Sequence, residues 1–217
     1  MKTTIRAKSD RAATKDKTFA GKGVLITGAA GGIAIATAAR FARCGAKLAL
    51  CDINAEATAA IANQIRSDGG QATVVTADVT NRHSVDQMMA DAQNAVGSID
   101  ILVTCAGGYT SYADFESIDE DDWDHVIALN MKSVFLCCRA VIPLMKKGNW
   151  GRIINLGSLA GRSTSAGTSP AHYGAAKAAV SMMTQYLAKR YGALWHNRQH
   201  RRAGDHRHRT CGAPADP

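Results

Sequence analysis

Residues 23–34 narrow the choice of fold more than any other stretch of the sequence. Residues 23–27 read Gly-Val-Leu-Ile-Thr, a short apolar run that is typical of a buried strand. Glycines follow at positions 28, 31 and 32, and an alanine-rich segment with helical character then runs to about Cys44. A strand, a glycine-rich turn and a helix in this order can bind phosphate, because the turn lets backbone N–H groups approach a diphosphate and the helix N-terminus carries partial positive charge. The stretch therefore predicts a nucleotide-binding turn.

The alternation of strands and helices continues along the chain. Further strands are predicted at 47–52, 72–76, 99–103 and 151–156, and further helices at 54–68, 82–96, 119–147 and 171–191. The helix at 119–147 is expected to be either unbroken or broken near Pro143. This alternation favours an α/β fold of the Rossmann type, a doubly wound parallel sheet covered by helices on both faces. Ligands of such sheets bind at the carboxyl ends of the strands.

Asp52 is the candidate for cofactor recognition. It ends the second predicted strand, about 20 residues after the glycine turn, where a carboxylate can accept hydrogen bonds from the adenosine ribose hydroxyls. A 2′-phosphate would meet this negative charge, and the glycine turn contains no Lys or Arg to receive it. The sequence therefore favours NAD over NADP. Asp52 is also a candidate N-cap of the following helix, and it can serve both purposes.

Tyr173 and Lys177 are the candidate catalytic pair. They stand four residues apart on a predicted helix, so their side chains lie on the same helix face. An ammonium within a few ångströms of a phenol favours the phenolate, which suits a tyrosine for proton transfer near neutral pH.

The net charge of the 217-residue chain is +8, and this charge sits at the two ends. Residues 1–22 carry a net +5 and residues 195–217 a net +3, whereas residues 23–194 hold fourteen charges of each sign. The basic character therefore does not belong to the folded body, and no nucleic-acid partner is expected. We expect a flexible basic extension at 1–20, one dinucleotide-binding and catalytic domain at 21–195, and an irregular tail at 196–217.

The cysteines and the apolar segments indicate a cytoplasmic protein without a metal site. The six cysteines lack metal-ligand spacing, and Cys44, Cys51 and Cys105 stand in apolar segments, which favours buried reduced thiols. No apolar run reaches the roughly 18 residues needed to cross a bilayer, so no membrane partner is expected. The N-terminus also lacks the apolar core of a secretory signal.

With these motifs in place, residues 21–195 resemble the short-chain dehydrogenase/reductase family. In the family's order, the marks are Thr27-Gly28-x-x-x-Gly32-Ile33, Asp78-Val79, Ala106-Gly107, Asn130, Ser158 and Tyr173-x-x-x-Lys177. The resemblance implies a single-domain oxidoreductase that transfers a hydride between NAD(H) and a secondary alcohol or ketone. It also implies a small-molecule substrate and a homo-oligomer, either a tetramer or a dimer.

The resemblance assigns roles to four catalytic residues. Tyr173 would be the general acid in carbonyl reduction and the base in alcohol oxidation, and Lys177 would hold the nicotinamide ribose. The hydroxyl of Ser158 would orient the substrate oxygen, and Asn130 would anchor a water that relays the proton to solvent. The cofactor would lie against Gly28, Gly31, Gly32, Ile33, Asp52, Asp78, Val79, Ala106, Gly107, Tyr173 and Lys177.

The sequence departs from the family pattern in the two strand-end motifs. Ala34 stands where the family has its third turn glycine, and its methyl group is expected to crowd the helix against the strand. Thr104-Cys105 replaces the usual Asn-Asn before Ala106, which alters the side-chain hydrogen bonds that brace the central strand.

The loops near the candidate site also differ from the family. Ser158 precedes Tyr173 by fifteen residues where thirteen is usual, and we place the extra two between 162 and 169. Three aromatic residues after the fourth strand either line the mouth of the pocket or are ordinary surface-loop residues: Tyr109, Tyr112 and Phe115.

Residues 197–209 are rich in Arg and His and have no apolar period. If the arginine codons are CGN, the reading frame one nucleotide later permits Val-Asn, then Pro-Gly and Thr, as in the next strand of the family. The hypothesis is that the chain is frameshifted near codon 197 and lacks its last strands, and the coding DNA tests it. The alternative function is then a non-catalytic nucleotide-binding remnant. A tail that binds metal or nucleic acid through His206 and His208 is a third interpretation.

Overall fold

The computed structural model describes residues 17–163 and 169–196. Expectations about 1–16, about the loop at 164–168 and about the tail at 197–217 lie outside the described residues, and these include the frameshift and the missing strands. The end of the predicted extension is described from residue 17 onwards. There, Phe19 donates its backbone N–H to the carbonyl oxygen of Cys44 at 3.0 Å, and its ring lies 5.1 Å from the ring of Phe41. Phe19 therefore packs on the folded body.

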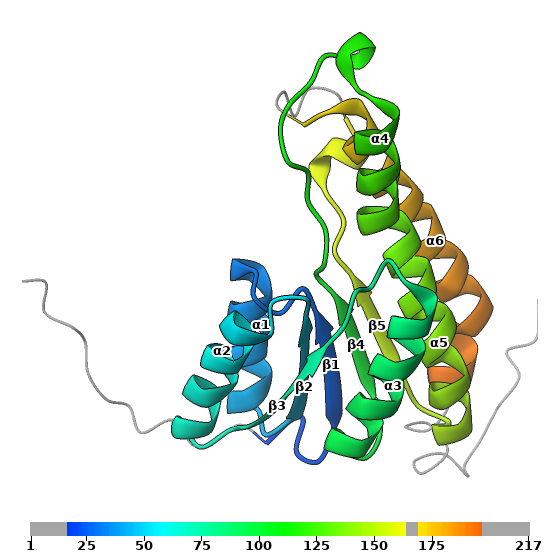
Figure 1. Ribbon diagram of the computed structural model, residues 1–217. Helices are drawn as coiled ribbons and strands as arrows, with labels where there is room; N and C mark the ends of the chain where they lie inside the picture. Colours follow the sequence, from blue (N-terminus) through cyan, green and yellow to red (C-terminus); the bar gives the residue numbers. More distant parts are fainter. Residues whose placement is uncertain (1–16, 164–168, 197–217) are drawn as a thin grey trace, which may run out of the picture.

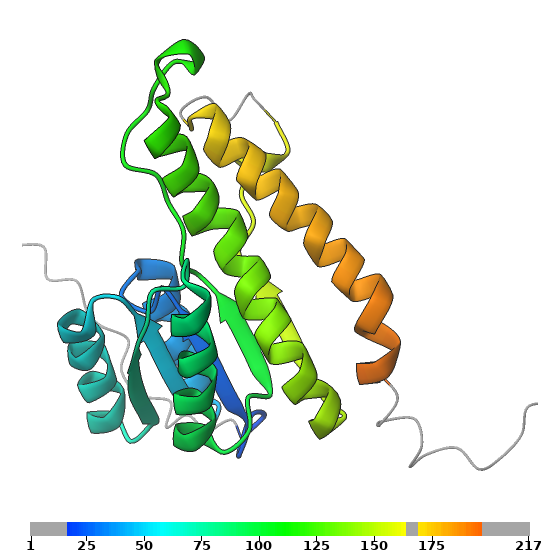
Figure 2. The ribbon, with the colours of Figure 1, turned by 45° about the vertical axis from the view of Figure 1, so that its right-hand side comes forward.

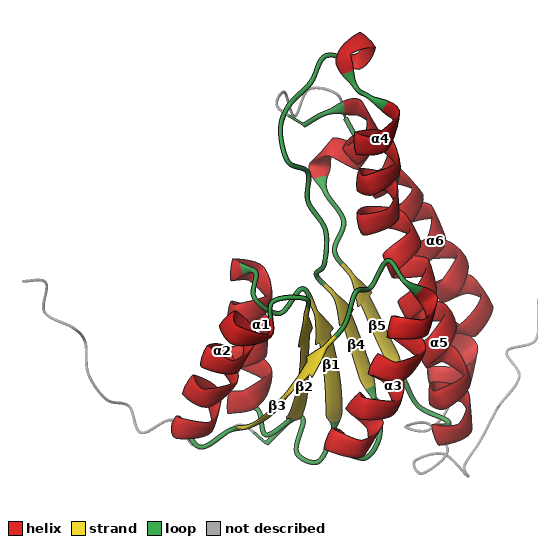
Figure 3. Cartoon of the chain, viewed as in Figure 1, coloured by secondary structure: helices red, strands yellow, loops and turns green. Residues whose placement is uncertain are grey.

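Five parallel strands form one sheet in the order β3-β2-β1-β4-β5 (Figure 1). The strands are β1 Gly23–Thr27, β2 Lys47–Asp52, β3 Gln71–Thr76, β4 Ile101–Thr104 and β5 Arg152–Asn155. The predicted parallel α/β fold is thus confirmed. The chain order reverses at β1, which lies between β2 and β4, and such a switch point opens a crevice at the carboxyl ends of the strands. The loops that carry the predicted site leave the sheet at this edge (Figure 3).

Helices cover both faces of the sheet (Figures 1 and 2). One face carries α1 Gly32–Arg43 and α2 Ala55–Ser67, and the other carries α3 Arg82–Val96, α5 Ser133–Gly148 and α6 Ala171–His196. Buried side chains form two clusters, one on each face of the sheet. Val24 and Ile26 of β1 belong to the cluster that includes α1 and α2, and Leu25 belongs to the cluster that includes α3 and α5. Because a strand covered on both faces buries every side chain, β1 carries three consecutive apolar side chains at 24–26 rather than an alternating pattern.

A single helical run crosses the site and continues into the core. It consists of α4 Glu120–Ile127, a π-helical turn Ala128–Lys132 and α5. The irregularity therefore lies at the π turn, and the break that the sequence allowed near Pro143 does not occur. Pro143 lies on the exposed side of α5, where the carbonyl group that loses its helical partner can face water.

This run, Glu120–Gly148, is long and apolar enough to cross a membrane by length and composition, with a mean hydropathy of 1.6. Its apolar side is nevertheless buried within the domain. Val134, Val141 and Met145 belong to the cluster that also contains Leu25 and Leu102 of the sheet. The run is therefore a core helix of this domain.

Candidate active site

The glycine turn follows β1 directly and touches the loop that follows β4. Gly28 has a φ of +64°, a conformation that favours glycine. A Cβ atom at Gly28 would lie 2.5 Å from the backbone nitrogen of Ala106, so a side chain there would force the two loops apart. The methyl group of Ala34 does not prevent close packing, because Ala34 is fully buried in the same cluster as Val24 and Ile26.

The start of α1 is open to an anion. The helix begins at Gly32 with Gly31 as its N-cap; no side chain caps this end, and the first turn contains no acidic residue. The N–H groups of the first turn have no partner within the helix, and the helix dipole adds partial positive charge. Together with the tight turn at Gly28, this geometry fits the diphosphate of a dinucleotide.

Asp52 ties the end of β2 to the glycine turn. Its two carboxylate oxygens accept hydrogen bonds from the backbone N–H groups of Ala30 and Asn54, both at 3.0 Å. The N-cap of α2 is Asn54, whose side chain accepts from the N–H of Ala57 at 3.0 Å. The expectation that Asp52 itself caps the helix is therefore wrong, because the N-cap position lies two residues later and the helix begins at Ala55. Each oxygen of Asp52 keeps a lone pair for a hydroxyl donor.

A pocket of about 520 Å³ lies at this edge of the sheet. Seven residues predicted to bind the cofactor line it: Gly28, Gly31, Asp52, Asp78, Val79, Ala106 and Gly107. Gly32 and Ile33 are not among the lining residues, and the side chain of Ile33 is 66% exposed. Tyr173 and Lys177 lie outside this pocket as well. The structure thus gathers the residues expected at the adenosine and diphosphate end of a dinucleotide.

The pocket also contains seven residues that the sequence analysis missed: Ile53, Ala77, Thr80, Cys105, His125, Ala128 and Leu129. The first four are chain neighbours of predicted residues, so proximity alone would have found them. The last three come from α4 and the π turn. Their spacing indicates a common helix face, but nothing in the sequence indicates that this face points at the pocket.

Asn130 holds the loop that follows β4. Its side chain is fully buried within the π turn. Its Oδ1 accepts a hydrogen bond from the N–H of Gly108 at 2.9 Å, and its Nδ2 donates to the carbonyl oxygens of Gly108 at 2.7 Å and of Val126 at 2.9 Å. Both Nδ2 hydrogens are therefore committed, and one lone pair of Oδ1 remains.

Lys177 is buried at the centre of the site, only 5% exposed. Its Nζ donates to the carbonyl oxygen of Leu156 at 3.1 Å and lies 5.6 Å from the ring centroid of Tyr173. Burial lowers the pKa of the Lys177 ammonium, and the nearby thiol of Cys105 partly opposes this effect. A Cβ atom at Gly107 would lie 3.2 Å from this Nζ and 2.7 Å from Oδ1 of Asn130, so the glycine is the spacer between the two side chains.

Ser158 stands just after β5, at the start of a short 3-10 helix, Leu159–Gly161. Its hydroxyl oxygen accepts a hydrogen bond from the N–H of Ala160 at 3.2 Å, and its hydrogen remains available to a ligand. Ser158 and Lys177 line a common pocket of about 360 Å³. The structure therefore brings Lys177 and Asn130 together at Gly107, with the ring of Tyr173 near Nζ of Lys177. Ser158 lies in the pocket that it shares with Lys177.

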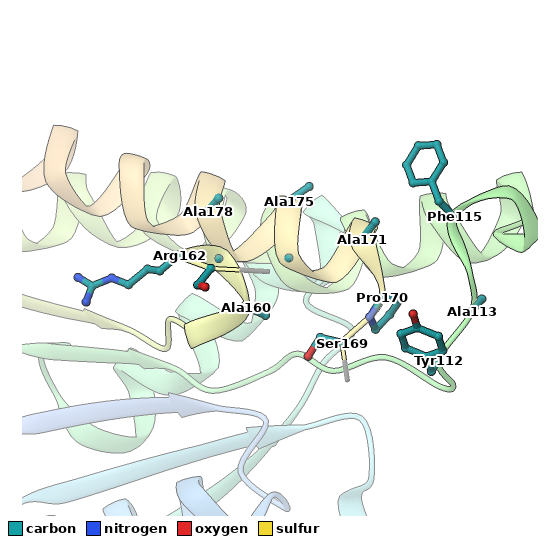
Figure 4. A pocket seen from close by; sticks show the side chains of 13 residues that line it. Tyr112, Ala113, Phe115, Ala160, Arg162, Ser169, Pro170, Ala171, Ala175 and Ala178 are labelled. Atoms are coloured by element: carbon teal, nitrogen blue, oxygen red, sulfur yellow. The ribbon is translucent and has the colours of Figure 1, made fainter. Parts of the chain in front are cut away.

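The three loop aromatics fall into two groups. The ring of Tyr109 lies 4.8 Å from the ring of Tyr173 in an edge-to-face arrangement. Tyr112 and Phe115 instead line a pocket of about 580 Å³, to which α6 contributes Ala171, Ala175 and Ala178 (Figure 4). These alanines recur at helical spacing on the side of α6 away from Tyr173. This pocket therefore lies beside the catalytic face and not on it.

A chain of hydrogen bonds braces β4, β5 and α6. The hydroxyl of Thr104 donates to Oδ1 of Asn155 at 2.9 Å, and Nδ2 of Asn155 donates to Oγ1 of Thr184 at 3.0 Å. Thr184 lies on the helix that carries Tyr173. The substitution of Thr104 for the usual asparagine therefore leaves the central strand braced, through Asn155.

Comparison with known proteins agrees with this geometry. The sequence profile of the short chain dehydrogenase family matches residues 22–194. The chain is 40% identical over 171 residues to 2,5-dichloro-2,5-cyclohexadiene-1,4-diol dehydrogenase LinX of Sphingobium indicum, covering 78% of this chain and 67% of that protein. It is also 40% identical over 166 residues to a 3-oxoacyl-[acyl-carrier-protein] reductase of a Synechocystis species, covering 76% and 66%.

Solved structures show the same arrangement of the chain. A crystal structure of NAD+-bound xylitol dehydrogenase superposes with a TM-score of 0.78 at 33% identity and covers 82% of this chain and 68% of that chain. This chain thus spans about two thirds of the length of the relatives that it matches.

Replacing Lys177 by methionine is expected to stabilise the isolated protein. The substitution removes a buried ammonium and keeps the volume of the side chain, so the free energy of unfolding should rise by about 0.5 to 2 kcal/mol near neutral pH. Burial lowers the pKa of Lys177 in the folded state below its ordinary value of 10.5. Between the folded and the unfolded pKa, the unfolded chain therefore binds more protons than the folded chain. The free energy of unfolding of the wild type thus rises as the pH approaches 10.5.

The gain of Lys177→Met should therefore shrink with rising pH. Urea unfolding of both proteins at neutral pH and near pH 10 measures it, with the exposed Lys147→Met as the matched control. A loss of stability at neutral pH would show that the buried ammonium is favourable in the folded protein.

Proposed function

Because the chain belongs to the short-chain dehydrogenase/reductase family, we propose that it interconverts a secondary alcohol and a ketone with NAD(H) as the hydride carrier. The observation that carries this proposal is that Lys177 and Asn130 meet at Gly107, which lines a pocket that fits a dinucleotide, while Nζ of Lys177 lies 5.6 Å from the ring centroid of Tyr173. A nicotinamide dinucleotide supplies the hydride for ketone reduction and accepts it in alcohol oxidation.

The glycine turn would bind the diphosphate of the cofactor through backbone N–H groups. Asp52 would accept hydrogen bonds from the adenosine ribose, and Asp78 and Val79 would border the adenine. Asp78 already accepts hydrogen bonds from the N–H and hydroxyl of Thr80 at 2.8 and 2.7 Å, which holds the turn after β3 in place. The small residues at 106 and 107 leave room for the ribose that Lys177 would hold.

Proton transfer would fall to Tyr173. In reduction, Oη of Tyr173 would give its proton to the carbonyl oxygen of the substrate, and in oxidation it would accept the proton of the alcohol. Ser158 would donate a hydrogen bond to the same oxygen and stabilise the charge that develops there. A relay water at Asn130 would donate to the remaining lone pair of Oδ1, because both Nδ2 hydrogens are already used.

The relatives act on cyclic, acyl and sugar-alcohol compounds, as their names state. This range supports the class of substrate, a secondary alcohol or its ketone, and no narrower one.

Replacing Tyr173 by phenylalanine is expected to remove turnover and to leave cofactor binding intact. The ring remains, but the only group that exchanges a proton with the substrate is lost, so kcat should fall by about 10²- to 10⁴-fold. Nicotinamide absorbance on a panel of secondary alcohols and ketones measures kcat, and NADH fluorescence measures binding. Tyr186→Phe, at an exposed site on the same helix, is the control.

Turnover of Tyr173→Phe within severalfold of wild type would overturn the assignment of the proton donor. Wild-type protein that binds NADH but turns over no compound on the panel would instead support the alternative, that the chain is a non-catalytic nucleotide-binding remnant.

Discrimination against NADP is expected to depend on Asp52. A 2′-phosphate would face its carboxylate, so kcat/KM should favour NAD, and Asp52→Ala should reduce this preference by about 10- to 100-fold. Titration of both cofactors with a fixed substrate measures the ratio. Glu56→Ala, an exposed acid in the first turn of α2, controls for a general change of charge. Equal use of NAD and NADP by the wild type would contradict the proposal.

We also propose that two copies of the chain associate through α5 and α6. Large apolar side chains are exposed on these helices, with Phe135 at 50%, Met182 at 65% and Tyr186 at 64%. Sedimentation velocity should give at least a dimer mass, and Phe135→Asp with Tyr186→Asp should lower it to the monomer, whereas Gln87→Asp on α3 should not. A monomeric wild type would exclude this association.

A cytoplasmic location is part of the same proposal. None of the five cysteines in the described part of the chain forms a disulfide bond. Burial raises the pKa of the thiols of Cys51 and Cys105 to about 12 and about 11, which keeps them protonated and unreactive. Reduced, inert thiols suit a reducing compartment, and subcellular fractionation would test this location.

A further inference from the structure

A buried histidine stands next to the proposed proton donor in the chain. His172 lies in the first turn of α6, immediately before Tyr173, and its side chain is 0% exposed. Its Nε2 lies 3.2 Å from Oδ2 of Asp122 on α4, and its ring stacks on the ring of Trp123 with a centroid distance of 6.0 Å. The described residues offer neither ring nitrogen a hydrogen bond of good geometry. A buried polar group so placed calls for an explanation.

His172 is the large anchor of this part of α6. The neighbouring residues Ala171, Gly174, Ala175 and Ala176 are small, and of these only Ala176 is fully buried. Small side chains fix the rotation and depth of a helix turn poorly, because they make few contacts. The stacked ring of Trp123 and the carboxylate of Asp122 therefore hold the turn from which Tyr173 projects.

The same helical run reaches Tyr173 by a second route. In the π turn that follows α4, Asn130 binds both the N–H and the carbonyl oxygen of Gly108. The next residue, Tyr109, places its ring 4.8 Å from the ring of Tyr173. Tyr173 is therefore connected to the same helical run on two sides. On one side, α4 contacts His172, the residue before Tyr173. On the other side, the π turn after α4 binds the loop of Tyr109, whose ring contacts Tyr173.

We propose that His172 and Asp122 form a clamp between α6 and α4 that sets the position of Tyr173. His172 is then a positioning residue for the proposed reaction, on which this inference rests. Proton transfer requires heavy atoms within about 2.6 to 3.2 Å of one another, and a displacement of about 1 Å can lower a rate about 100-fold. A clamp at the adjacent residue limits such a displacement, and it touches neither substrate nor cofactor.

The test compares variants that remove one partner of the clamp, remove both partners, or keep a hydrogen-bond donor at residue 172. His172→Leu and Asp122→Ala each remove one partner, and His172→Gln keeps an N–H donor near the position of Nε2. We expect kcat to fall about tenfold or more in the first two, while KM and the NADH dissociation constant change by less than about twofold. His172→Gln should recover to within about threefold of wild type, and the double variant should be no slower than either single one. Asp121→Ala and His83→Leu, at exposed sites, are the controls.

Unchanged kcat in both single variants would overturn the clamp, and so would losses that multiply in the double variant. If His172→Leu fails to fold, Asp122→Ala and His172→Gln still decide between these outcomes.

A measurement independent of turnover separates this inference from the proposed function. Amide hydrogen exchange of residues 174–178, followed by mass spectrometry, should speed up about tenfold or more in Asp122→Ala if the clamp holds the first turn of α6. Unchanged exchange would overturn the clamp even in an active enzyme. A wild type without turnover but with the expected change in exchange would overturn the proposed function alone.

Discussion

The parallel pairing of β1 with β2 on one side and with β4 on the other is the constraint on which the whole site depends. In register, Thr27 lies opposite Cys51 and Thr104, so these strands end at one level. The glycine turn, the carboxylate of Asp52 and the loop at Gly107 all follow within a few residues of that level. Because the chain order reverses at β1, a crevice opens at this edge of the sheet, and the pocket of about 520 Å³ lies there.

The helical run from Glu120 to Gly148 has two tasks that a regular helix would combine poorly. Its second half must keep an apolar face on the sheet, and its first half must direct His125 and Asn130 into the site. One residue added to a turn shifts the helix face by about 100°. The π turn at Ala128–Lys132 supplies such a shift, so Asn130 binds the loop after β4 while Val134 and Val141 stay in the core. π turns of this kind recur at functional sites.

The site concentrates buried polar groups that a stability-optimised core would lack. Lys177 loses solvation and keeps one carbonyl partner. Asn130 donates one amide hydrogen to the loop carbonyl of Gly108 and the other to the carbonyl of Val126 in α4. His172 faces a carboxylate without a well-formed hydrogen bond. Buried groups of this kind lower stability unless they are fully paired. The proposed reaction would gain from this loss of stability. A desolvated ammonium interacts more strongly with a neighbouring phenol or ribose hydroxyl, and tightly held side chains stay in position relative to the reacting atoms.

The sequence by itself determined the elements and the local motifs. The bounds of β1, β2 and α3 agree with the periodicity. Gly28, Asp52, Tyr173 and Lys177 could be predicted as site residues because each depends on spacing within one segment. The tertiary structure alone decided what meets across segments: the face of α4 that lines the pocket at the carboxyl edge of the sheet, the hydrogen bonds of Asn130 with Gly108, and the contact of His172 with Asp122. Such contacts join residues about 20 to 50 positions apart, and they depend on how helices dock on a twisted sheet, which no local pattern encodes.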